Sequence, residues 1–276
     1  MTLYDRRARV LVGPRLFEFP GLRISFKVTR QFGQTANTAE VIVHNLSEAS
    51  RGAVMRADKP EFVIEAGYAS GFGALFTGKA LRVTTHRETI GIATKFDSTD
   101  GSEEMQKTVS KTYAPGTKVG KVLADLAGGM NINAANAIKR ALSGDLSGAV
   151  DTFREGVTVA GKIGDEFDRI LIALGAAWSV ENGELVVLKA GESVDSALVL
   201  GPATGLIGSP ERFFDAKHRK VYMVKGQAVL SSRIFPGRRV ELNTQETRGS
   251  FLVTKTEHSG DTHGPEWSTS FESMRL

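Results

Sequence analysis

The sequence predicts a mainly β protein with a central α+β region, in which two antiparallel β-barrel domains flank an insertion of helices and a β-hairpin. Three observations predict this fold. Apolar and polar residues alternate from residue 22 onward, the middle of the chain has a helical period, and strand-like alternation returns after about residue 194. We therefore expect a first β-domain at residues 1–100, a helical and hairpin region at 101–193, and a second β-domain at 194–276.

The longest alternating segment covers residues 22–47 and reads LRISFKVTRQFGQTANTAEVIVHNLS. Its apolar residues fall at every second position on both sides of a polar loop: Leu22, Ile24, Phe26 and Val28 before the loop, and Val41 and Val43 after it. A period of two is expected where one face of a strand is buried and the other is polar. The segment therefore predicts a long antiparallel hairpin.

More strands follow this hairpin. Residues 62–66 and 75–85 read as strands that are joined by a glycine-rich turn containing Gly71 and Gly73, and residues 91–101 continue the meander. Glycine supplies the positive φ values that tight hairpin turns require. The first part of the chain thus predicts a compact antiparallel sheet or barrel of about five or six strands.

The central region has helical periodicity. Thr117 stands in the N-cap position of a helix that Gly128 and Gly129 end, and a second amphipathic segment covers about residues 133–142. A further helix has Asp165 and Glu166 in its first turn. The apolar faces of the first and last of these helices are formed by Val119, Val122, Leu123 and Leu126, and by Phe167, Ile170, Leu171 and Leu174.

Strands return in the remaining sequence. Residues 178–188 include the pair Asn182-Gly183, which favours a type I′ turn, and therefore predict a hairpin. After about residue 194 four further strands are expected, separated by turn residues such as Phe235-Pro236-Gly237. Their ranges are about 220–227, 238–243, 249–259 and 266–272.

Composition excludes several classes of function. The 276 residues are 41% hydrophobic and 24% charged, with no cysteine, which excludes disulfides, thiolate metal sites and cysteine nucleophiles. No apolar run is long enough to span a membrane, and the N-terminus has no secretory signal. The net charge of +4 comes from short, dispersed basic clusters. These favour a solvated surface, with contact to nucleic acid or an acidic partner as the alternative.

No catalytic or cofactor motif is present, so we expect the protein not to be an enzyme and to need no cofactor. The adjacent acids Glu103-Glu104 and Asp165-Glu166 are typical of solvated charges rather than of a glycosidase pair. His258, Asp261 and His263 are weak candidate metal ligands, because two imidazoles and a carboxylate within six residues suit zinc. Ser259, Gly260 and Asp261 are more typical of a turn between strands, so we expect no metal site there.

Two ordered blocks of sequence carry a resemblance to a known family. The first block consists of LRISFKV, NTAEVIVHNLS, Arg51, IEAGY and LFTGKALRV; the second consists of GLIGSPE, IFPGRRVEL and FLVTKTEHSGDTHGPEW. In this order they resemble the first and second tube domains of baseplate and tail hub proteins of contractile-tailed bacteriophages. The blocks cover more than half of the chain, whereas the central helices match no pattern of the family.

The resemblance implies a homotrimeric ring with two tail-tube-like domains in each subunit. Such a ring adapts the sixfold tail tube to a threefold central spike at the distal end of the virion tail, after assembly in the host cytoplasm. Its expected partners are the tail tube protein and the central spike protein, with the tape-measure protein and baseplate wedge proteins as further candidates. Phage DNA would pass through the lumen without sequence-specific binding, so we expect a neutral or acidic lumen wall.

Within this hypothesis the hairpin forms the wall of the ring, and Phe26, Val28, Val41 and Val43 are the expected interface residues. Edge strands paired between subunits would no longer be open to aggregation. Three alternatives remain: a tail tube or tube-terminator protein, a hub-associated peptidoglycan-degrading enzyme, and a nucleic-acid-binding module.

Overall fold

The computed structural model describes residues 5–33, 35–100, 102–130, 138, 152–181, 184–189, 192–194, 196–214 and 222–276. The chain divides into two compact units. The first unit combines the chain up to Gln31 with Asn37–Thr99 and Ser193–Leu276, and the second combines Phe32–Ala36 with Asp100–Glu192. The N-terminal and C-terminal β regions thus share one unit, and their existence as separate domains with the boundaries expected above stays a prediction.

The described residues of the first unit form strands, one α-helix and one short 3-10 helix. In chain order its elements are β1 (Arg6–Val12), β2 (Arg15–Phe19), β3 (Ile24–Gln31), β4 (Asn37–His44), α1 (Glu48–Arg56), β5 (Glu61–Tyr68), β6 (Gly73–Arg87), β7 (Ile92–Asp100), β14 (Leu198–Leu200), η1 (Pro202–Thr204), β15 (Leu206–Phe213), β16 (Met223–Val229), β17 (Arg239–Asn243), β18 (Arg248–Asp261) and β19 (Trp267–Arg275).

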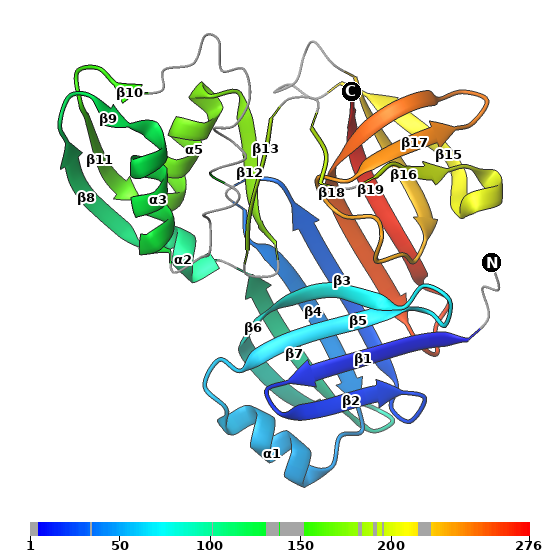
Figure 1. Ribbon diagram of the computed structural model, residues 1–276. Helices are drawn as coiled ribbons and strands as arrows, with labels where there is room; N and C mark the ends of the chain where they lie inside the picture. The colour runs from blue at the N-terminus through cyan, green and yellow to red at the C-terminus, as the bar shows by residue number, and fades with distance from the viewer. Residues whose placement is uncertain are drawn as a thin grey trace. The chain divides into compact units, whose positions relative to one another are not determined.

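The strands of this unit form one sheet. Among the described residues it contains 13 strands, and its main path runs β15-β16-β19-β18-β3-β4-β7-β6-β5-β1-β2, while β17 pairs with β18 and with β14. The N-terminal and C-terminal regions meet where β18 pairs antiparallel with β3, from Lys255 opposite Gln31 to Asp261 opposite Ser25. Figure 1 shows the long strands side by side at this junction, with β1, β2 and β5 crossing them. The expected mainly β fold is confirmed.

The predicted hairpin is also confirmed, as β3 and β4. The two strands pair from Ile24 opposite Val43 to Thr29 opposite Thr38, and their apolar residues face inward. Helix α1 directly after it was not predicted. Its start is fixed by Ser47, whose side-chain oxygen accepts a hydrogen bond from the Ser50 backbone N–H, as N-cap residues do.

Each β region has its own hydrophobic core. The first core contains the inward-facing side chains of β1 to β7 together with Leu230 and Trp267, and the second is formed by residues of β14 to β19, including Phe251 and Phe271. The unit therefore has two cores but one sheet, in which the N-terminal and C-terminal β regions are joined where β3 pairs with β18.

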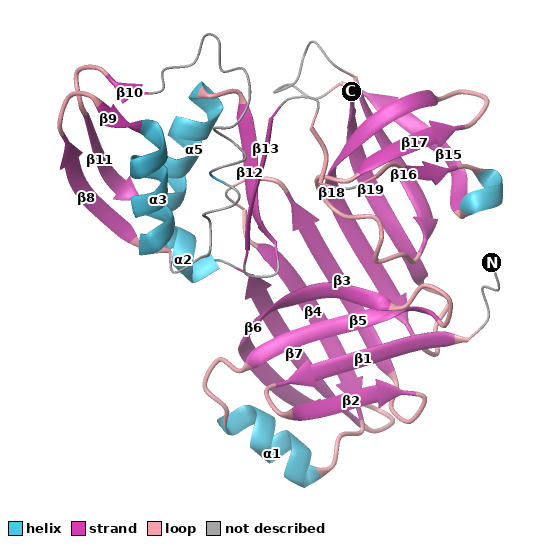
Figure 2. Ribbon diagram, viewed as in Figure 1, coloured by secondary structure: helices cyan, strands magenta, loops and turns pink. Residues whose placement is uncertain are grey.

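The second unit contains helices and short pairs of strands. Its elements are α2 (Ser102–Gln106), β8 (Thr108–Tyr113), β9 (Thr117–Lys118), α3 (Val119–Gly129), β10 (Thr152–Phe153), β11 (Val157–Lys162), α5 (Ile163–Ala173), β12 (Ala176–Glu181) and β13 (Glu184–Lys189). Figure 2 shows α3 and α5 beside the antiparallel β8–β11 pair, and their apolar faces meet in one core with Trp178.

The helix faces predicted from the sequence are confirmed, but one cap is wrong. Lys118 is the N-cap residue of α3, and the Thr117 hydroxyl instead donates a hydrogen bond to the Ala114 carbonyl in the preceding turn. The β12–β13 pair confirms the predicted hairpin, whereas its Asn182-Gly183 turn lies outside the described residues. The expected helix at 133–142 also lies outside the described residues, except for Ile138, which is helical and buried.

None of the helices among the described residues combines the length and apolarity that crossing a bilayer requires.

Candidate interaction surface

The four predicted interface residues lie in the core of the chain. Phe26 is 5% exposed and Val28, Val41 and Val43 are 0% exposed, and all four belong to the first hydrophobic core. Alternation therefore identified the buried face of the hairpin. Their role between subunits stays a prediction, while in the single chain their contribution is to core packing.

The three candidate metal ligands do not converge. The His258 ring is fully buried, and its Nδ1 lies 2.9 Å from the Thr269 Oγ1. Burial, reinforced by the nearby positive charge of Arg30, lowers the pKa of His258 to about 3, so the imidazole is neutral. His263 is exposed at the following turn. Among the described residues no group of three His, Asp or Glu side chains is arranged to hold a metal ion.

Asp261 instead fastens the turn between β18 and β19 to the rest of the sheet. Its carboxylate lies 2.6 Å from Arg23 Nη2 and accepts a hydrogen bond from the His263 backbone N–H. Arg6 donates to the backbone carbonyls of Asp261 and Gly264. Burial alone would raise the pKa of Asp261, but the hydrogen bonds from Arg23 and His263 outweigh it and hold that pKa below its ordinary value.

Two outward-facing side chains of the β3–β4 hairpin, Lys27 and Glu40, belong to a row of paired charges that crosses the sheet. Lys27 on β3 lies 3.1 Å from the Glu257 carboxylate on β18. Lys95 on β7 lies 2.8 Å from Glu40 on β4 and 2.9 Å from Asp97 on its own strand. The register also places Lys27 opposite Glu40. We call Lys27, Glu40, Lys95, Asp97 and Glu257 the charge row.

Hydrogen bonds to two carboxylates hold Lys95 of the charge row in its charged form. The pKa of Lys95 is raised, first by its hydrogen bond to Asp97 and then by that to Glu40. The carboxylates in this row outnumber the lysines by one, so the row as a whole carries a slight negative charge. A surface of this kind offers little uncompensated positive charge to a phosphate.

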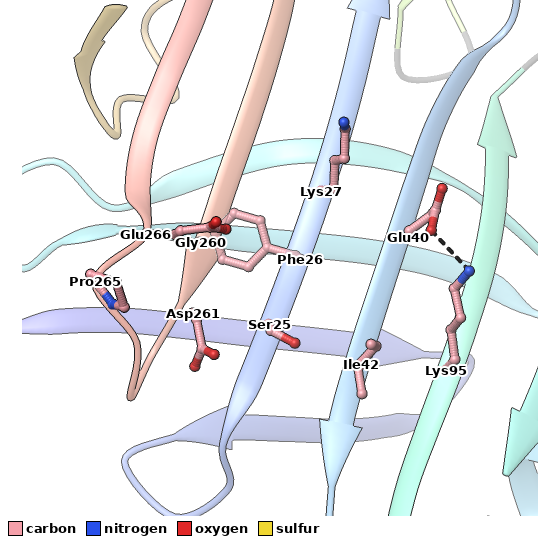
Figure 3. Close-up of a pocket in the computed structure, with 10 residues that line it drawn as sticks. All are labelled: Ser25, Phe26, Lys27, Glu40, Ile42, Lys95, Gly260, Asp261, Pro265 and Glu266. Atoms are coloured by element: carbon pink, nitrogen blue, oxygen red, sulfur yellow. Dashed lines mark ion pairs between the residues drawn. The ribbon is translucent and has the colours of Figure 1, made fainter. Parts of the chain in front are cut away.

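A shallow groove lies next to the charge row. It has a volume of about 410 Å³, and Figure 3 shows it between Lys27, Glu40 and Lys95 on one side and Asp261, Pro265 and Glu266 on the other. Ser25 and Ile42 lie between these two sides. The lining combines paired ions with small polar and aliphatic groups, a combination suited to contact with another protein surface rather than to acid–base chemistry.

Sequence reasoning missed the charge row, although part of its signal was present. Polar residues alternate with the apolar ones in both strands of the hairpin, which predicts that Lys27 and Glu40 share the outward face. Glu257 is more than 200 positions away in the sequence, and nothing local to it indicates that β18 pairs with β3.

Comparison with known proteins reveals similarity at the level of structure. No protein-family model matches the sequence, and a comparison with curated proteins found no match. A tail protein from Neisseria meningitidis is 10% identical, with a TM-score of 0.67 over 99% of this chain and 97% of its own. The 43 kDa tail protein of prophage MuSo2 from Shewanella oneidensis is also 10% identical, with a TM-score of 0.67 over 98% of this chain and 97% of its own.

A third solved structure extends the likeness beyond phages. The E. coli c3393 protein, a component of the type VI secretion system, is 10% identical, with a TM-score of 0.60 over 99% of this chain and 77% of its own. That protein is described as structurally similar to the T4 bacteriophage tail proteins gp27 and gp5. The resemblance found in the sequence is thus confirmed in its structural neighbours: the chain has the fold of bacteriophage tail proteins and of a related secretion-system component.

Proposed function

We propose that the protein is a structural component of a phage tail, a baseplate hub that forms a trimeric ring at the distal end of the virion tail. The ring joins the sixfold tail tube to the threefold central spike and becomes part of the channel for DNA. The observation that carries the proposal is the pair of β regions, each with its own core, that one chain joins in a single sheet through β3 and β18.

Two β regions in one chain allow a trimer to match both a sixfold and a threefold partner. Three copies of a chain with two β regions present six of them around one axis, a number that matches a sixfold tube, while the chain itself repeats three times for a spike. The full-length likeness to two tail proteins supports this role, as does the relation of the E. coli neighbour to gp27 and gp5. The tail tube and central spike proteins are then the expected partners.

The charge row supports a place on the wall of the channel. Passing DNA is retained where lysines and arginines can neutralise its phosphates and release counterions. In the charge row, Lys27 on β3 pairs with Glu257, and Lys95 on β7 pairs with Glu40 and Asp97. Such a face lets a polyanion slide past, which agrees with the neutral or acidic wall expected from the resemblance.

The mass of the assembled ring tests the proposal. Light scattering of the purified chain, followed by electron microscopy of intact tail tips, should give a trimer with threefold symmetry. A hexamer would support the tail tube or terminator alternative instead. Cleared zones on a cell-wall zymogram would support the peptidoglycan-degrading alternative, and either result would overturn the hub assignment.

A further inference from the structure

A second groove lies in the C-terminal β region, away from the charge row. It has a volume of about 440 Å³, and its lining is mainly aliphatic. One wall consists of Ala197 and strand β14. The other consists of the last two residues of β16 and of residues from the segment that follows it, as far as Ile234. Val199 in the middle of β14 is 51% exposed, an unusual position for a valine in a strand of a sheet with a sizeable core.

Among the described residues, β14 has a neighbouring strand on one edge only. β14 pairs in parallel with β17, from Leu198 opposite Val240 to Leu200 opposite Leu242. In the described part of the chain no other strand pairs with β14. Leu198, Val199 and Leu200 all line the groove, so β14 forms part of its wall. A short apolar edge that no strand of the described residues covers is a ready site for pairing with another strand.

A positive charge lies at the same groove. Arg233 lines it and is exposed, and its backbone N–H donates to Ser231 Oγ. In the described residues no carboxylate forms an ion pair with its guanidinium, in contrast to Arg239 on neighbouring β17, which pairs with Glu241 at 2.8 Å. An arginine beside an apolar groove favours an occupant that carries a carboxylate.

We propose that this groove binds an extended segment of a partner protein that adds a strand to the free edge of β14. Its apolar side chains lie against Leu198, Val199 and Val229, which line the groove and are accessible, and a carboxylate of the segment pairs with Arg233. A helix does not fit this role, because its backbone N–H and C=O groups already bond one another and leave the edge of β14 unpaired. The occupant is therefore an acidic, strand-forming segment, and the site does not depend on the hub assignment.

Three synthetic hexapeptides test the proposal on the full chain. The first has valine alternating with threonine and one aspartate, the second has lysine in place of aspartate, and the third is the first with N-methylated valines. Binding is followed by NMR of the Leu and Val methyl groups. The acidic peptide should shift the signals of Leu198, Val199 and Leu200 and bind about fivefold more tightly than the lysine peptide. The N-methylated peptide, which lacks strand donors, should bind about tenfold more weakly.

Two charge-reversal variants complete the experiment. Arg233→Glu should invert the preference between the acidic and lysine peptides. Arg15→Glu should leave it unchanged, because Arg15 is also an exposed arginine but lies on β2, which does not pair with β14, β16 or β17. Absence of shifts at β14, equal affinity for the N-methylated peptide, or an unchanged preference in the Arg233→Glu variant would each overturn the proposal.

Discussion

Gly260 lies directly opposite Phe26 where β18 pairs with β3, and the Phe26 ring occupies the space that a side chain at position 260 would need. A Cβ added at Gly260 would lie 2.7 Å from Phe26 Cε1 and 2.9 Å from Trp267 Cε3. Phe26 in turn meets the Trp267 ring edge to face, with centroids 5.5 Å apart. The C-terminal region repeats this arrangement, since Gly226 lies opposite Phe271 and in contact with its ring.

The first prediction follows from this contact. Gly260→Ala should lower the free energy of unfolding by about 1–3 kcal/mol, because the added methyl group forces Phe26 or Trp267 out of place. Urea denaturation measures the loss. Gly128→Ala is the control, since nothing lies within 4 Å of the added methyl in helix α3, and alanine there should stabilise the fold by up to about 1 kcal/mol.

A double variant tests the contact directly. The combination of Phe26→Leu with Gly260→Ala should lower the free energy of unfolding by less than the sum of the two single changes. Full additivity would refute the clash between the added methyl group and the Phe26 ring.

The second prediction separates the two faces of the β3–β4 hairpin. Val43→Asp places an unpaired charge in the first core and should unfold the chain, because Val43 is 0% exposed. Ile42→Asp changes the neighbouring, outward-facing position, which lines the groove beside the charge row. Because this face is proposed to line the channel, that variant should keep both the thermal unfolding transition of the wild type and the trimer in light scattering. Loss of the trimer in the Ile42→Asp variant would place this face between subunits and overturn its assignment to the channel wall.

Local periodicity predicted the strands and helix faces well, because burial on one side imposes a period that is visible within about ten residues. The alternation in β3 and β4 and the apolar stripe of Phe167, Ile170 and Leu171 are examples. Two local features differ from the prediction. Helix α1 is absent from the prediction, although Ser47 is a residue type that begins helices. Thr117 is not the N-cap of α3, because its hydroxyl donates a hydrogen bond to the Ala114 carbonyl in the preceding turn.

The candidate surface was less predictable than the fold. A single sequence shows which residues of a strand share a face, but not which distant strand lies beside it. The Lys27–Glu257 pair and the contact of Gly260 with Phe26 both depend on the pairing of β18 with β3, which joins segments more than 200 residues apart. The same limit explains why the predicted interface residues proved to be core residues: alternation marks the buried face without saying what covers it.

The third prediction concerns the charge row. Replacing Glu40, Asp97 and Glu257 by Gln, Asn and Gln removes three negative charges and leaves Lys27 and Lys95 without carboxylate partners. The triple variant should retain duplex DNA at low salt more strongly than the wild type, with a steeper loss of binding as salt rises. Gel shifts between about 50 and 200 mM salt measure both effects.

A matched control tests whether the location of these charges matters. Glu61, Glu184 and Glu246 are exposed carboxylates outside the charge row, and their replacement by Gln changes the net charge by the same amount. If both triple variants bind DNA equally, net charge alone explains the effect, and the charge row has no special role in keeping the proposed channel free of phosphate contacts.

The fourth prediction concerns acid stability. The pKa of His258 is about 3 in the folded chain, chiefly because the ring is buried, and its ordinary value is 6.5. Between these two values the unfolded chain binds a proton that the folded chain does not, so folding loses stability as the pH falls through this window. The loss should be about 1.4 kcal/mol per pH unit below 6.5, or roughly 2 kcal/mol by pH 5.

His258→Gln should remove this part of the pH dependence, because an amide can still bond Thr269 but takes up no proton in this range. Comparing urea unfolding of the wild type and the variant at pH 7 and pH 5 isolates the contribution, since all other titrating groups are shared. If the free energy of unfolding falls equally with pH in the wild type and the His258→Gln variant, the prediction is wrong. The buried ring would then accept a proton without loss of structure, and Arg30 and the strands packed on the ring would have to move apart to admit the charge.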